Sequence, residues 1–238
     1  MFIVYFHYSS KQVKDYPTKK DKSISLIRIT SRIEDLSECI EFINDLKNYT
    51  KLQVSLNLFN FSNYQISDLL ILKKNIIKSF ADFVYIADTH GNIDFYNSDK
   101  KQIDFLFFLK SLDKNIGFHF HDNVGTAFSN FKFCINKGFN YFDSTIFGIG
   151  RGGGNLRTEY IVNKKYKHHM SNFITNFKNN LIVDYNIYCF VSGLHSVSNL
   201  YANYAYKKNI DINKFDNFCS KLNFYKKNNF NLKTISSL

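Results

Sequence analysis

The sequence has no tryptophan and only one proline, Pro17. Its four cysteines, Cys39, Cys134, Cys189 and Cys219, lie far apart and form no CxxC pair, which argues against a disulfide framework or a zinc ribbon. No apolar run approaches the roughly 20 residues that cross a bilayer. The start, MFIVYFHYSS, has neither the basic start nor the small-residue cleavage site of a secretory signal. We therefore expect a soluble, cytoplasmic protein with reduced thiols and no membrane partner.

Positive charge is in excess, because 31 Lys and Arg residues face 20 Asp and Glu residues, for a net charge of +11. Such a balance is also found in nucleic-acid-binding proteins. Here the lysines are dispersed, with short pairs but no long basic block. Together with the heavy use of Asn, Ile, Phe and Tyr, this is typical of an AT-rich coding sequence. We expect no nucleic-acid partner.

The chain has 238 residues, of which 45% are hydrophobic, enough for one α/β domain with a sizeable core. Short runs rich in β-branched and aromatic residues alternate with segments of helical period, which predicts parallel strands buried on both faces. The predicted strands are Phe2–Phe6, Ser25–Thr30, Gln53–Phe59, Phe83–Asp88, Ile116–His121 and Tyr141–Ile146. The predicted helices are Glu34–Tyr49, Asp68–Phe80, Lys100–Leu112 and Asn123–Lys137, with another beginning near Asn155. In the polar tail beyond, Ile187–Val191 and Ile212–Leu222 are expected to pack.

The predicted strands end in polar residues. Barrels and doubly wound sheets both build their sites at the carboxyl ends of parallel strands. The ends carry Arg28 to Thr30, Asn57, Asp88 to Asn92, His119 to Asn123, and Asp143 to Thr145. This pattern predicts a functional site at that edge of the sheet.

The stretch GFHFHDN places His119 and His121 two residues apart at the end of a strand. Residues at i and i+2 of a strand project to the same side, so both imidazoles aim at one place while Phe118 and Phe120 face the other way. Two imidazoles completed by oxygen ligands can hold a divalent metal ion. The alternative is a pair of structural histidines with ordinary hydrogen bonds.

The second element is GIGRGGGNLRTE, which runs from Gly148 to Glu159. Glycines allow close approach of the backbone to a ligand and positive φ values, and a following helix would present N–H groups to an anion. The alternative is a flexible connection. The stretch is neither a P-loop nor a dinucleotide fingerprint.

Other polar residues are less decisive. Arg28 suits a bidentate bond to a substrate carboxylate or a plain ion pair. We expect His90, a loop histidine, to be solvated, although an acid–base role is an alternative, and His168 and His169 to be exposed. The spacing gives no role to His195.

The motifs YIADTHGN, GFHFHDNVGTAFSN and GFNYFDSTIFGIGRGGGNLRTEY follow one another with the spacing found in a known family. In this respect the chain resembles the DRE-TIM metallolyase superfamily, which includes hydroxymethylglutaryl-CoA lyase, 4-hydroxy-2-oxovalerate aldolase and isopropylmalate synthase. The resemblance covers Ser25 to Val162 and, more faintly, the segment YCFVSGLHSVSNLYANYA.

The resemblance implies an α/β fold of the TIM (β/α)8-barrel type with a divalent metal at its C-terminal face. His119, His121 and Asn155 match the metal site, and Asp143 and Asn123 its supporting residues. For binding of the substrate acid the resemblance implies Thr89, and we add Arg28 and Arg151. No residue is assigned as the catalytic base.

One departure from the family is that no RDG-like sequence occurs near Met1. Our six strands begin at what aligns with the family's third strand. We therefore predict a barrel truncated at its N-terminus to about six parallel strands. The expected division is a partial barrel over residues 1–162 and a helical extension packed on it over residues 163–238.

The family implies a carbon–carbon lyase or aldolase acting through an enolate of a 2-oxo acid such as pyruvate, with an aldehyde as the other reactant. The expected cofactor is Mn²⁺ or Mg²⁺, with Zn²⁺ and Co²⁺ as alternatives. Two further readings stay open. The chain is an inactive truncated homologue that binds another chain, or it is one half of a split enzyme. A homo-oligomer, or a chain that supplies the missing βα units, is the corresponding partner.

Overall fold

The structure is a computed structural model that describes residues 2–7, 12–21, 23–97, 100–177 and 185–236. It divides into two compact units. Unit 1 comprises Met1–Ala87, Ser98–Phe118 and Phe139–Tyr141, and unit 2 comprises Asp88–Asn97, His119–Gly138 and Phe142–Leu238. The predicted division at residue 162 stays a prediction.

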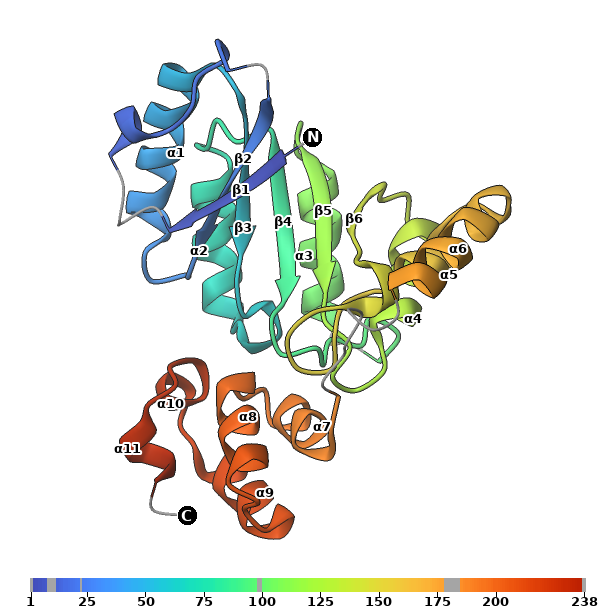
Figure 1. Ribbon diagram of the computed structural model, residues 1–238. Coiled ribbons are helices and arrows are strands. Elements are labelled where there is room, and N and C mark those ends of the chain that lie inside the picture. The colour runs from blue at the N-terminus through green and yellow to red at the C-terminus, as the bar shows by residue number, and fades with distance from the viewer. Residues whose placement is uncertain (1, 8–11, 22, 98–99, 178–184, 237–238) are drawn as a thin grey trace. The chain divides into compact units, whose positions relative to one another are not determined.

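Six strands form one sheet in which spatial order follows sequence order, from β1 to β6 (Figure 1). Their bounds are β1 Phe2–His7, β2 Ile24–Ser31, β3 Gln53–Leu58, β4 Phe83–Asp88, β5 Asn115–Phe120 and β6 Tyr141–Asp143. The pairs β1–β2, β2–β3 and β3–β4 are parallel. Strands added one after another on the same side are typical of a singly wound barrel, whereas a doubly wound sheet reverses its order. The structure confirms the predicted parallel α/β class.

Three helices cover the sheet of unit 1: α1 Leu36–Thr50, α2 Ile66–Ile76 and α3 Lys100–Lys110. They form one layer, because α1 contacts α2 and α2 contacts α3 (Figure 1). The predicted spacing holds in α1, whose Ile40, Ile43 and Leu46 side chains are buried.

A short ionic contact ties this helix layer to the sheet. Lys47 of α1 binds both carboxylate oxygens of Asp82 at 2.6 and 2.7 Å. Asp82 also accepts the N–H of Val54 on β3 at 2.8 Å. The Asp82 carboxylate therefore joins α1 to β3 through charge-assisted hydrogen bonds, which are stronger than bonds between neutral groups.

The C-terminal part of unit 2 is helical, as predicted. Helices α7 Ile187–Leu194, α8 Asn199–Lys207 and α9 Ile212–Lys221 surround a core that includes Cys189, Tyr201 and Phe215. The chain adds the short helices α10 Phe224–Asn228 and α11 Leu232–Ile235. Each of the five begins at an Asn, Ser or Asp whose side chain accepts a backbone N–H of its first turn. Such N-caps satisfy donors that a helix otherwise leaves open.

Most predicted boundaries differ from the structure by a few residues, and three of the differences lie near the predicted site. The last strand ends at Asp143, and α4 begins only at Ala127 and runs to Asn136. The helix expected near Asn155 is α5, Thr158–Ile161, followed by α6, Lys167–Phe177. Asn155 itself is extended and forms an isolated antiparallel bridge with His121. Short 3-10 turns occupy Val13–Asp15, Phe61–Asn63, Ile146–Gly148 and Lys164–Tyr166.

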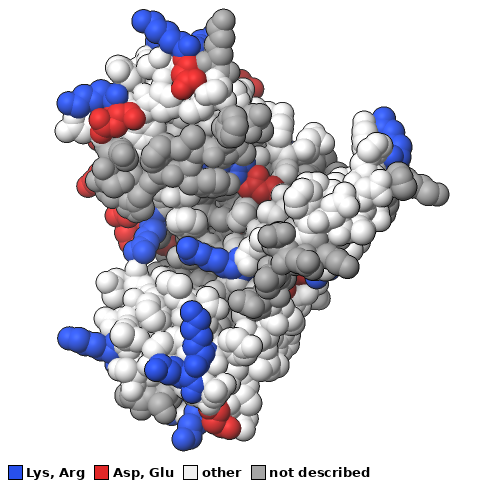
Figure 2. All heavy atoms as spheres, in the orientation of Figure 1, with Lys and Arg blue, Asp and Glu red and all other residues white. Residues whose placement is uncertain are grey.

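Lys and Arg side chains of the described residues lie in separate groups over the face shown in Figure 2. None of the helices within the described ranges combines the length and the apolar character needed to span a bilayer.

Candidate functional site

Seven of the eight predicted site residues belong to unit 2, where they lie at or beyond the ends of β4, β5 and β6. These seven are Thr89, His119, His121, Asn123, Asp143, Arg151 and Asn155. The eighth, Arg28, belongs to unit 1.

The two histidines lie side by side. Their ring centroids are 5.0 Å apart and the rings are nearly perpendicular, at 80°. Phe118 and Phe120, which alternate with them along the chain, are fully buried. The alternation of the strand thus brings the two imidazoles together while the phenylalanines pack into the core.

Hydrogen bonds fix the same tautomer in both rings. His119 Nδ1 lies 3.1 Å from Asp143 Oδ2, and His121 Nδ1 lies 3.3 Å from the Arg151 carbonyl oxygen. A carboxylate and a carbonyl only accept, so each Nδ1 carries the proton and donates it. In the neutral form of each ring, Nε2 therefore keeps its lone pair. Acceptors behind the Nδ1 atoms are the usual support of metal-binding histidines.

The electrostatic environment of His121 also keeps it neutral. Removal from water, followed by the neighbouring His119 ring, lowers the pKa of His121 to about 3. A neutral imidazole is the form that binds a metal ion.

The side-chain oxygen of Asn155 is a third candidate ligand atom. Its bridge with His121 is continued by hydrogen bonds from Asp122 N to the Gly154 carbonyl at 2.9 Å and from Leu156 N to the Phe120 carbonyl at 3.0 Å. Asn155 Nδ2 donates to the Ile149 carbonyl at 2.9 Å. Its Oδ1 is buried and has no hydrogen-bond partner within the described residues. An unpaired buried acceptor is costly, so this oxygen is suited to a ligand.

These groups fit a divalent cation. Two imidazole nitrogens and one amide oxygen make a mixed donor set, of the kind that Mn²⁺, Zn²⁺ and Co²⁺ accept. Over the part of the chain that the structure describes, no group of three or more His, Cys, Asp and Glu side chains is placed to hold a metal. The candidate ligands are therefore His119, His121 and the amide of Asn155.

The side-chain hydrogen bonds of Asn123 go to Gly153 and to the helical region. Its side chain is fully buried, and its Oδ1 accepts the N–H of Gly153 at 2.9 Å. Its Nδ2 donates to the Cys189 carbonyl at 3.0 Å and to Asn199 Oδ1 at 2.6 Å. Asn123 thus joins the glycine loop, residues 148–154, to helices α7 and α8.

The glycines of that loop serve close packing within the chain. A Cβ added to Gly153 would lie 2.5 Å from Asn123 Cα, and one added to Gly152, whose φ is +64°, would lie 2.4 Å from Asn199 Nδ2. Any larger residue would push the loop away from the turn that follows His121.

The residues predicted to bind the substrate acid have different surroundings. Arg151 is exposed, and its backbone carbonyl oxygen, not its side chain, accepts the hydrogen bond from His121 Nδ1. Thr89 is half-buried in the loop after β4. Arg28 is buried in unit 1, where its guanidinium lies 4.0 Å from the centroid of the Tyr85 ring. Their roles in substrate binding stay predictions.

The expectation of a solvated His90 is wrong. His90 is 1% exposed, and its Nε2 lies 3.0 Å from Asn228 Oδ1. Burial lowers the pKa of His90 to about 4. The partner is 138 residues away, so no local pattern could have revealed this contact.

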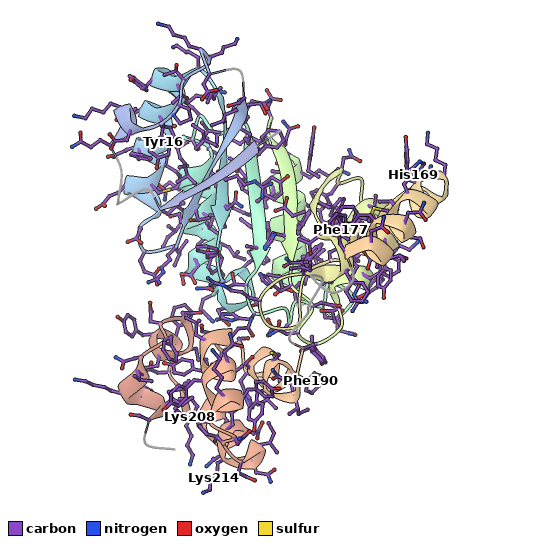
Figure 3. The ribbon with its side chains drawn as sticks, in the orientation of Figure 1. Tyr16, His169, Phe177, Phe190, Lys208 and Lys214 are labelled. Carbon is purple, nitrogen blue, oxygen red and sulfur yellow. The ribbon has the colours of Figure 1, made fainter. Side chains whose placement is uncertain are left out.

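Two further histidines have surroundings of their own. His169 is exposed on α6, as expected (Figure 3), and His195 Nε2 lies 2.8 Å from Asp216 Oδ1. The side chain of His168 lies outside the described residues.

Sequence reasoning also missed Asn199, whose Oδ1 accepts from Asn123 Nδ2, and Ser192 beside it. Ser192 Oγ lies 3.1 Å from Asn199 Oδ1 and 2.9 Å from the Cys189 carbonyl oxygen. An open pocket of about 430 Å³ also lies in this region. Its lining includes Lys208 and Lys214, both labelled in Figure 3, and none of the predicted site residues.

Comparisons with known proteins agree on one family. The model of the HMGL-like family matches residues 15–181. A 4-hydroxy-2-oxovalerate aldolase from Geobacillus genomosp. 3 is 29% identical over 152 residues, which are 63% of this chain and 43% of that protein. An oxaloacetate decarboxylase from Mycobacterium tuberculosis is 30% identical over 115 residues, 47% of this chain and 32% of that protein. The chain spans less than half the length of these curated relatives.

Solved structures share the fold. The N-terminal domain of a proposed aldolase from Bacteroides vulgatus superposes with a TM-score of 0.66 at 22% identity, covering 87% of this chain and 73% of that one. The carboxyl transferase domain of Rhizobium etli pyruvate carboxylase gives 0.61 at 12% identity, covering 83% of this chain and 37% of that one. At such identities the likeness concerns the fold alone, and it confirms the predicted barrel type.

Proposed function

The chain belongs to the HMGL-like family of aldolases and lyases, and on that premise we propose that it acts as a divalent-metal-dependent carbon–carbon lyase or aldolase on a 2-oxo acid such as pyruvate. The observation that carries the proposal is the histidine pair. Both Nδ1 atoms face acceptors, both Nε2 atoms keep their lone pairs, and the unpaired Oδ1 of Asn155 lies on the segment bridged to His121.

The relatives support the substrate class. The names 4-hydroxy-2-oxovalerate aldolase and oxaloacetate decarboxylase both describe 2-oxo acids whose carbon–carbon bond is broken. The reaction class that we propose has a 2-oxo acid and an aldehyde as its small-molecule partners.

Each residue has a proposed task. His119, His121 and Asn155 hold the ion, and Asp143 and the Arg151 carbonyl keep the two imidazoles in the binding tautomer. A bound divalent ion supplies Lewis-acid stabilisation of the negative charge that develops on the oxo-acid oxygen. Thr89 and the Arg151 side chain of unit 2 are proposed to bind the substrate carboxylate, for which a guanidinium group is well shaped. The predicted role of Arg28, which lies in unit 1, stays a prediction.

A second candidate is a module that works by associating with another chain, without catalysis of its own. The supporting observation is that β1 and β6 stand at the two ends of the sheet order, with one neighbouring strand each. Such strands carry backbone groups that can pair with another chain. Such a module can still bind a metal or another ligand, so catalysis of proton exchange on pyruvate is what distinguishes the enzyme from it.

The test is the metal content and the Mn²⁺ affinity of the purified chain, beside a His119→Ala/His121→Ala double variant. We expect one ion per native chain and none in the double variant. His169→Ala, which removes an exposed histidine of the same unit, is the matched control and should bind as the native chain does. Exchange of the methyl protons of pyruvate in D₂O, followed by NMR, then tests the chemistry. Undiminished binding in the double variant would contradict the assignment of the ligands, and a chain that binds no metal and exchanges no protons would favour the association module.

A further inference from the structure

Asn199, at the start of α8, is a buried side chain of the helical region that bonds Asn123 behind the candidate metal site. Asn199 is 8% exposed, and its Oδ1 accepts a hydrogen bond from Asn123 Nδ2 at 2.6 Å. Ser192 Oγ lies 3.1 Å from the same oxygen, and its single proton is shared with the Cys189 carbonyl, 2.9 Å away. Polar groups on both sides of this buried amide oxygen favour one orientation.

Asn199 in turn fixes which way Asn123 faces. With its Nδ2 engaged by the Asn199 oxygen and by the Cys189 carbonyl, Asn123 must present Oδ1 to the N–H of Gly153, 2.9 Å away. A flipped Asn123 amide would set its NH₂ group against that N–H and lose the bond. The orientation of Asn123 therefore depends on α7 and α8.

The glycine loop carries this orientation to the metal ligands. Within it, Gly154 N donates to the Arg151 carbonyl at 3.1 Å, and the same carbonyl accepts from His121 Nδ1 at 3.3 Å. Asn155 directly follows the loop, and its Nδ2 donates to the Ile149 carbonyl within the loop. Both His121 and Asn155 thus depend on the position of a loop that Asn123 and Asn199 hold.

We propose that Asn199 is a positioning residue of the metal site, which makes helices α7 and α8 part of the machinery that orients His121. Hydrogen bonds link Asn199 to Asn123 and Asn123 to Gly153. The backbone continues to Gly154, whose N–H and His121 Nδ1 both donate to the Arg151 carbonyl. The proposal rests on the metal site of the proposed function. Residues that support metal ligands in this way typically change affinity about 10- to 100-fold when they are removed.

The first readout needs no metal. In long-range ¹H–¹⁵N spectra of the metal-free chain, we expect His121 as the Nδ1–H tautomer. Asn199→Ala should give mixed tautomers at His121 and leave the exposed His169 ring unchanged. Asn199→Asp keeps the accepting oxygens and should restore the single tautomer. Asn199→Ser, too short to reach Asn123, repeats the test if the alanine variant does not fold.

The second readout is Co²⁺ affinity from the visible absorption of the bound ion. Asn199→Ala should raise the Kd about 10-fold. The control is Asn223→Ala, which removes the N-cap of α10 in the same region. It should lower thermal stability and leave Co²⁺ affinity unchanged.

The outcomes separate the two proposals. Native tautomer and native Co²⁺ affinity in Asn199→Ala would overturn the positioning role while leaving the metal site intact. Loss of affinity in Asn223→Ala as large as in Asn199→Ala would overturn it too, because general destabilisation would then explain both. A native chain that binds no Co²⁺ would overturn the metal site of the proposed function, and the tautomer of His121 would still decide the role of Asn199.

Discussion

Substitution of Gly153 by alanine should displace the glycine loop and weaken metal binding, although it adds only one methyl group. The added Cβ would lie 2.5 Å from Asn123 Cα and 2.6 Å from the Asp122 carbonyl oxygen, and both neighbours are backbone atoms. Reaching the 3.4 Å of an ordinary contact from 2.5 Å requires a shift of about 0.9 Å. A shift of that size moves the loop away from His121, whose bond to the Arg151 carbonyl is already 3.3 Å long.

Two quantities should change. Overpacking of this kind costs about 1–3 kcal/mol of the free energy of unfolding, and we expect the upper end because no flexible side chain can yield. Loss of the acceptor behind His121 should raise the Kd for Mn²⁺ about 10- to 100-fold. Urea unfolding and isothermal titration calorimetry measure the two.

Gly125→Ala is the matched control. Gly125 has a φ of +80°, but a Cβ there would meet nothing within 4 Å. Its substitution should cost about 1–2 kcal/mol through backbone strain alone and leave Mn²⁺ affinity unchanged. If Gly153→Ala binds Mn²⁺ as tightly as the native chain, the inferred coupling between the loop and His121 is wrong.

Two further predictions concern carboxylates. Asp143→Ala removes the acceptor of His119 Nδ1, 3.1 Å away, and should raise the Kd for Mn²⁺ about 10-fold, measured by calorimetry; an unchanged Kd would show that His119 needs no such support. Burial raises the pKa of Asp88 from 3.8 to about 7. Its contribution to stability is therefore complete below pH 3.8 and is lost as the pH rises through 7, up to about 4 kcal/mol in urea unfolding of the metal-free chain. Asp88→Asn should flatten that dependence. Because the lowered pKa values of His90 and His121 give the opposite pH dependence in both chains, the test is the difference in free energy of unfolding between the native chain and Asp88→Asn. An equal difference at pH 5 and at pH 8 would contradict the prediction.

Much of the fold could be predicted from the sequence because the relevant signals are local. Six hydrophobic runs are found as six strands, and Leu36, Ile40, Ile43 and Leu46 face the core of α1 at the predicted spacing. The pairing of His119 and His121 follows from the same logic, since a strand alternates its sides every residue. The family resemblance could also be detected from the sequence, because each of its motifs is a contiguous stretch.

The places where the structure departs from helical or strand periodicity could not be predicted from the sequence. The start of α4 is delayed to Ala127 because Asp122 Oδ1 accepts the N–H of Ala127, and the segment at Asn155 is extended because it bridges to His121. Helical periodicity in the sequence predicts neither the late start of α4 nor the extended segment at Asn155. Both depend on a partner in another part of the chain.

The sequence by itself determined the strands, the helical tail, the pair of imidazoles and the family resemblance. Only the tertiary structure decided which atoms support that pair: Asp143 behind His119, the Arg151 carbonyl behind His121, and Asn199 behind Asn123. It also decided that His90 is buried against Asn228. The physical reason is that strand and helix periods are set by the backbone, residue by residue. A hydrogen bond between residues 24 to 138 positions apart exists only once the chain has folded, and its partners leave no spacing to read.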